Sequence, residues 1–118
     1  MVEFGEVARG WRIFFWVAAA YNLVIGLAGM LSPEATVDGR IVGLLVFAFG
    51  IIYALVARDA LRFAPVLWAG IIGKGGVIAL VAPVAFGDPG DPTVAAVLVG
   101  DGLFLLGFLA FLFQRDEA

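Results

Sequence analysis

The amino-acid sequence predicts an all-α integral membrane protein, a single transmembrane domain over residues 1–118 folded as a four-helix up-down bundle. Hydrophobic residues make up 64% of the chain and charged residues 14%, whereas a soluble domain usually has about 25% charged residues. The mean hydropathy is +1.10. Four apolar segments approach the roughly 20 residues that a helix needs to cross a bilayer. These segments are expected to be helices because backbone amides in hydrocarbon need internal partners, and the alternating pattern of a membrane strand is absent.

The four helices are expected at about residues 11–31, 41–57, 63–86 and 94–113. The first begins after basic residues, as a signal peptide does, but its apolar run exceeds the usual ~7–15 residues and no small-residue cleavage site follows. It is therefore expected to be retained. The segments SPEATVDGR, RDALR and GDPGDPT separate the helices, and the last has two Asp-Pro pairs and two glycines, a strong loop signal. Such short connections make consecutive helices antiparallel neighbours.

The distribution of arginine predicts the orientation of the chain. Five arginines lie around the start of the first helix, in RDALR or after the fourth helix, and one lies in the other two connections: Arg9, Arg12, Arg58, Arg62 and Arg115 against Arg40. Because positive residues accumulate on the cytoplasmic side, both termini are expected to be cytoplasmic. The chain is then a multi-pass protein of the inner or plasma membrane.

Composition excludes several kinds of chemistry. Cysteine and histidine are absent and the net charge is −3, so disulfides, thiolate or imidazole metal sites and Cys or His catalysis are excluded. No metal site is expected, although a carboxylate-bound hard cation stays open, and no cofactor can be named. No basic patch is evident, so nucleic acid is not an expected partner. These absences favour a protein that is not an enzyme, with carboxylate, tyrosine or lysine chemistry left open.

Polar residues at similar depth form the candidate site. At about 1.5 Å per residue, the single lysine, Lys74, lies ~15 Å from the outer surface, Asp101 ~12 Å and Asn22 ~13 Å. A lone charge at this depth costs at least ~2.5–3.5 kcal/mol. Lys74 and Asp101 are therefore expected to pair across the third and fourth helices. The candidate ligand-binding or ion-pair residues are Lys74, Asp101, Asn22, Tyr21, Tyr53 and Arg40.

Arg40 and the glycines within the helices are expected to have structural roles. Arg40 is expected to snorkel to the head groups, while pairing with Asp101, Glu34 or Asp38 stays open. Glycines beside the charged pair are expected to let the third and fourth helices approach closely: Gly70, Gly73, Gly75, Gly76, Gly100 and Gly102. Four further glycines mark packing faces on the first and second helices: Gly26, Gly29, Gly43 and Gly50.

Several functions fit this pattern. The Lys74–Asp101 pair could be a site that binds or passes a small polar ligand or protons, because intramembrane ionisable residues are functional candidates by default. It could equally be a staple that fixes helix register in an accessory or structural subunit of a larger membrane complex. A dimeric exporter or fluoride-type channel is a transport variant. Besides the lipid bilayer, the expected partners are a second copy of the chain or larger membrane proteins.

The layout resembles the small four-helix membrane proteins grouped as DoxX-like. The resembling segments are GLAGMLSPE at the end of the first helix, GRIVGLLVFAFGIIYALVARD around the second, GIIGKGG in the third and GD in the fourth. The resemblance implies the four-helix membrane fold. Members of that family have been associated with quinone-linked oxidation and with accessory membrane roles, and the resemblance assigns no catalytic residue.

Overall fold

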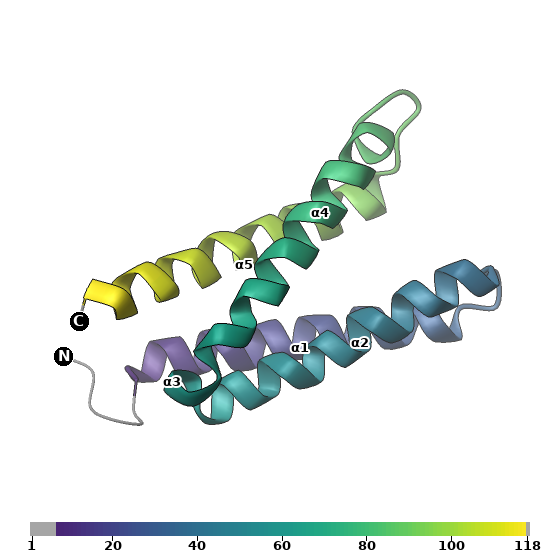
Figure 1. Ribbon diagram of the computed structural model, residues 1–118. Helices are drawn as coiled ribbons and strands as arrows, with labels where there is room; N and C mark the ends of the chain where they lie inside the picture. Colours follow the sequence, from purple (N-terminus) through teal and green to yellow (C-terminus); the bar gives the residue numbers. More distant parts are fainter. Residues whose placement is uncertain (1–6, 118) are drawn as a thin grey trace. The chain divides into compact units, whose positions relative to one another are not determined.

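The structure of the chain is helical. The computed structural model describes the backbone of residues 7–117 and the side chains of residues 7–114. Within this range the order of elements is α1 (Arg9–Leu31), α2 (Val37–Arg58), α3 (Ala60–Phe63), the 3₁₀ helix η1 (Ala64–Val66), α4 (Leu67–Ala85) and α5 (Pro92–Glu117) (Figure 1). The all-α class is therefore confirmed.

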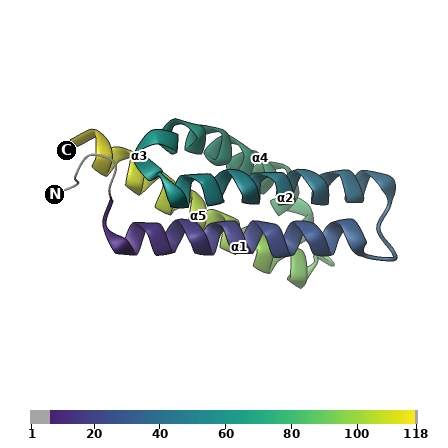
Figure 2. The same cartoon turned by 90° about the horizontal axis from the view of Figure 1, so that it is seen from below.

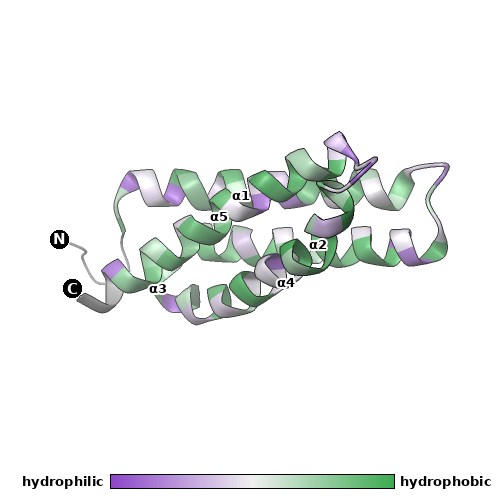
Figure 3. Cartoon of the chain, turned by 90° about the horizontal axis from the view of Figure 1, so that it is seen from above, coloured by the Kyte–Doolittle hydropathy of each residue, from purple (hydrophilic) through white to green (hydrophobic). Residues whose placement is uncertain are grey.

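Within the described residues, four helical stretches are long and apolar enough to cross a membrane. They cover Arg9–Leu31, Val37–Arg58, Ala60–Ala85 and Pro92–Gln114, and contain 22 to 26 residues each. At 1.5 Å per residue they are about 33–39 Å long, against about 30 Å of hydrocarbon. Figure 3 shows apolar colouring along most of their length, and many large apolar side chains point outward. The protein is a four-span membrane protein whose helices contact the lipid bilayer.

The chain forms two compact units that divide between Pro65 and Val66. In the first unit, α1 and α2 run side by side along their length (Figure 2). A Cβ atom added at Gly26 would collide with the backbone nitrogen of Phe47, and one at Gly43 would lie 2.7 Å from the backbone nitrogen of Met30. At Gly50 it would lie 2.8 Å from Cγ of Leu23. These glycines are packing faces, as predicted, because only glycine permits such close backbone approach.

Polar caps determine where α2 and α3 begin. The Thr36 hydroxyl accepts a hydrogen bond from the Gly39 amide at 3.0 Å, and Asp38 lies in the first turn, where a negative charge is favourable. The helix therefore begins at Val37, four residues before the first residue of the apolar run. Asp59 accepts a hydrogen bond from the Arg62 amide at 3.3 Å, so much of the expected charged turn RDALR is the short helix α3.

In the second unit, residues 86–91 join α4 and α5. Gly90 has a φ of 76°, which glycine adopts without steric cost. The Asp91 carboxylate accepts hydrogen bonds from the amides of Thr93 and Val94 at 3.1 and 3.2 Å, and Pro92 occupies the first helical position, where it is favoured. The two helices approach at this loop and separate toward their far ends (Figure 1).

Candidate functional site

Lys74 and Asp101 form a buried salt bridge between α4 and α5. Lys74 Nζ donates a hydrogen bond to Asp101 Oδ1 at 2.7 Å, a distance typical of a strong charge-assisted bond. The side chains are 6% and 13% exposed. The predicted pairing is confirmed. It explains how a chain this apolar accommodates its single lysine, because the partner carboxylate neutralises the ammonium group inside the apolar hairpin.

An aromatic ring also contacts the lysine. Lys74 Nζ lies 5.6 Å from the centroid of the Phe104 ring, within the range of a cation–π interaction. Phe104 follows Asp101 by three residues on α5, and residues at this spacing share a helix face. The ammonium group is therefore held by a carboxylate and an aromatic face from the same helix. The sequence interpretation did not include Phe104, although its spacing from Asp101 was a usable signal.

The Asp101 carboxylate has hydrogen-bond acceptor positions that the described residues do not occupy. A carboxylate has about four acceptor positions, and the Lys74 ammonium is the one partner that the described residues supply to it. The other acceptor positions are therefore available to a ligand atom or a proton donor.

Three of the glycines near the pair, Gly75, Gly76 and Gly102, are not points of backbone contact between α4 and α5. Among the described residues, a Cβ atom added at Gly75 would lie 4.0 Å from Leu105 Cδ2, one at Gly102 would lie 3.8 Å from Ile78 Cδ1, and one at Gly76 would have no atom within 4 Å. The prediction of close approach is wrong for these three positions. At Gly75 and Gly102 the nearest atoms belong to side chains of the facing helix, and Gly76 is on the exposed side of α4.

The other four candidate residues belong to the first unit. Asn22 Nδ2 donates to the backbone carbonyl of Val46 at 3.1 Å and so connects α1 to α2. Arg40 Nη1 donates to the carbonyl of Met30, near the end of α1, where backbone carbonyls lack helical partners. Tyr53 is fully buried, with its ring centroid 6.2 Å from that of Phe49, and Tyr21 is half-buried. Asn22 and Arg40 thus bind backbone within the α1–α2 hairpin.

Removing the amide of Asn22 is expected to weaken the α1–α2 hairpin. The Asn22→Ala variant loses the hydrogen bond to Val46, and interhelical hydrogen bonds in membranes contribute about 1 kcal/mol. Unfolding followed by circular dichroism in mixed micelles should therefore show a decrease in stability of about that size. Val24→Ala, at an exposed position on the same helix, is the control and should change stability less. Equal effects of the two substitutions would contradict this role for Asn22.

No known protein family, curated protein or solved structure matches this sequence.

Proposed function

We propose that the Lys74–Asp101 pair is a polar site within the membrane that binds a small polar ligand or transfers protons. The observation that carries the proposal is the buried 2.7 Å salt bridge between two apolar helices, each long enough to span a membrane. Charged residues at such positions are costly, and they commonly mark ligand or proton pathways. The remaining acceptor positions of Asp101 support the same role.

The proposed orientation places both termini in the cytoplasm. Arg9 and Arg12 lie in the first turns of α1, and Arg58 lies in the last turn of α2. Because α1 and α2 are antiparallel neighbours, these arginines share one end of the hairpin, while Arg40 lies at the other. The positive-inside rule assigns the arginine-rich end to the cytoplasm. Because this rule refers to the cytoplasmic side, we place the protein in the inner or plasma membrane. The resemblance to DoxX-like proteins remains part of this proposal.

Replacing Lys74 with methionine is expected to abolish the activity while the protein still folds. The experiment uses protein reconstituted in liposomes with a trapped pH-sensitive dye, and native mass spectrometry of the purified protein to detect bound small molecules. Wild type should show proton flux or a bound ligand, and Lys74→Met should show neither, because methionine fills the space without the charge. Ile72→Met, on an exposed position of the same helix, is the matched control and should behave as wild type.

Two outcomes would overturn this proposal. One is unchanged flux and ligand content in a folded Lys74→Met variant. The other is wild-type protein with neither proton flux nor a bound small molecule. The charge-reversed variant Lys74→Asp/Asp101→Lys adds a direct test. If the pair is only structural, the exchanged salt bridge should still hold the helices together. If the site needs a carboxylate on α5, the exchange should abolish proton flux and ligand binding.

The second candidate is an accessory or structural subunit of a larger membrane complex. It is favoured by the mutual neutralisation of Lys74 and Asp101 and by the exposed position of Gly76, where small residues suit helix contacts. Gentle extraction from native membranes followed by native mass spectrometry distinguishes the two. A complex with larger membrane proteins supports the subunit, with the pair as a staple. A monomer or homo-oligomer favours the polar site.

A further inference from the structure

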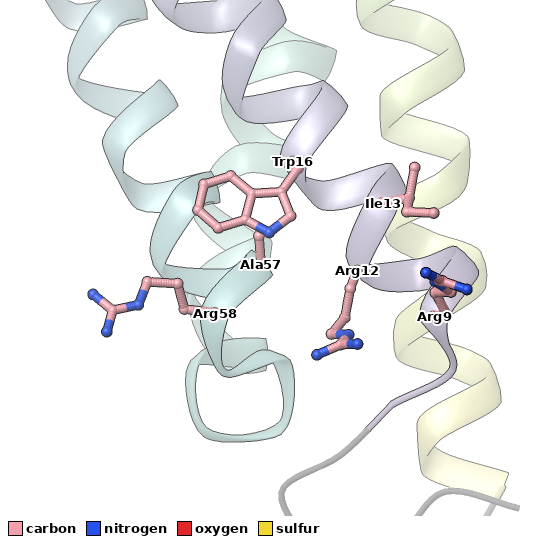
Figure 4. Close-up of a pocket in the computed structure, with 6 residues that line it drawn as sticks. All are labelled: Arg9, Arg12, Ile13, Trp16, Ala57 and Arg58. Carbon is pink, nitrogen blue, oxygen red and sulfur yellow. The ribbon is translucent and has the colours of Figure 1, made fainter.

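A second, positively charged site lies at one end of the α1–α2 hairpin. An open pocket of about 420 Å³ is lined by six residues of the first unit (Figure 4): Arg9, Arg12, Ile13, Trp16, Ala57 and Arg58. It shares no residue with the Lys74–Asp101 pair. Three of the six side chains are guanidinium groups, and none of the six is acidic.

The positive charge of this pocket is not neutralised by the described part of the chain. None of its three arginines forms an ion pair with a described residue. The N-terminus of α1, which carries Arg9 and Arg12, has no acidic residue in its first turn and no side-chain cap. A helix N-terminus contributes roughly half a positive charge of its own, so arginine is unfavourable there unless an anion is present. The pocket therefore has the electrostatics of an anion site.

An apolar surface continues from the arginines along α1. Ile13, Trp16 and Val17 are 55%, 48% and 51% exposed, and their spacing places them on one face of the helix. Since α1 is long and apolar enough to span the membrane, this face meets lipid tails. Tryptophan is also enriched at the boundary between head groups and hydrocarbon. The site thus combines cationic groups at the membrane surface with an apolar wall below them.

We propose that this pocket binds the phosphate-bearing head group of an anionic phospholipid. The guanidinium groups of Arg9, Arg12 and Arg58 point in different directions and do not converge on one point (Figure 4), so the proposal is based on their shared positive charge at this end of the hairpin. Arginine binds phosphate oxygens with paired, charge-assisted hydrogen bonds. Ile13 and Trp16 lie where the acyl chains begin. Basic pockets between membrane helices are suited to lipid head groups for these reasons.

The test measures lipid binding by native mass spectrometry of the full chain in detergent. Phosphatidylglycerol is titrated against phosphatidylcholine with the same acyl chains. The matched variants are Arg58→Gln and Arg62→Gln, each of which removes one positive charge from the same end of the hairpin, although only Arg58 lines the pocket. Arg58→Gln is expected to weaken phosphatidylglycerol binding about fivefold, and Arg62→Gln to change it less. The triple variant Arg9→Gln/Arg12→Gln/Arg58→Gln should lose the preference for phosphatidylglycerol.

Other outcomes contradict the proposal. Equal binding of the two lipids by wild type would show that no anion is recognised. Equal losses in Arg58→Gln and Arg62→Gln would show general surface attraction instead of a pocket. A competition with inorganic phosphate and with glycerol phosphate identifies the source of the anion. If either competes as well as the intact lipid at equal concentration, the ligand is a free phosphate compound and the lipid assignment is wrong.

Discussion

Replacing Asp101 with leucine is expected to lower the free energy of unfolding by about 3 kcal/mol, the cost of leaving a buried charge unpaired. The substitution leaves the Lys74 ammonium without its carboxylate at a position that is 6% exposed. The Phe104 ring remains, but a cation–π contact replaces only part of the lost interaction, about 1–2 kcal/mol. The measurement is the loss of helical circular dichroism as sodium dodecyl sulfate is titrated into mixed micelles.

The double variant Lys74→Met/Asp101→Leu separates the cost of an unpaired charge from the cost of altered packing. With no charge left in the hairpin, its stability should return close to that of wild type, because a buried ion pair is often replaced by apolar residues without loss. Leu103→Ala, on the exposed side of α5, is the control for a substitution that faces outward. An Asp101→Leu variant as stable as wild type would show that water or head groups reach the Lys74 ammonium.

The four membrane spans could be predicted from the sequence because composition and segment length alone decide them. The helix ends could not be predicted as closely, since they depend on polar residues outside the apolar runs. Thr36 caps α2 before the apolar segment begins, and Asp91 with Pro92 begins α5 inside a segment that was expected to be a loop. Capping side chains satisfy amides that a hydropathy pattern does not register.

The Lys74–Asp101 pair was predictable because the two residues lie at similar depth on helices joined by a short loop. The arginine pocket was not predicted: the sequence placed Arg12 and Arg58 on the same side of the membrane, but it did not show that their side chains line one pocket. The sequence contains no run of basic residues, so the arginines indicated orientation alone. The sequence thus predicted which arginines share one end of the hairpin, whereas the packing of α1 against α2 decides which of them line the pocket.

Glycines of the same kind pack in two different ways in this chain, and the sequence does not distinguish them. Gly26, Gly43 and Gly50 lie where α1 and α2 have their backbones in contact, whereas Gly75, Gly76 and Gly102 have room for a methyl group. The difference comes from the neighbouring side chains. In the α4–α5 hairpin, the nearest neighbours of Gly75 and Gly102 are the Leu105 and Ile78 side chains, and Gly76 is on the exposed side of α4.

Replacing Gly43 with leucine is expected to lower the free energy of unfolding by about 3 kcal/mol, at the upper end of the usual cost of overpacking. The added Cβ would lie 2.7 Å from the Met30 nitrogen and 2.8 Å from the Gly26 carbonyl oxygen. Both are backbone atoms of α1, so the helices must move apart, and their other contacts weaken with them. The measurement is again unfolding by sodium dodecyl sulfate in mixed micelles.

Gly76→Leu is the matched control for this substitution, because it makes the same chemical change inside a helix where a Cβ atom meets no described atom within 4 Å. Its stability should equal or slightly exceed that of wild type, since leucine favours a helix more than glycine does. A loss in Gly76→Leu as large as that in Gly43→Leu would show that Gly76 also faces a close neighbour, such as a second copy of the chain. A stable Gly43→Leu variant would instead show that α1 and α2 separate at little cost, and that their backbone contact does not hold the hairpin together.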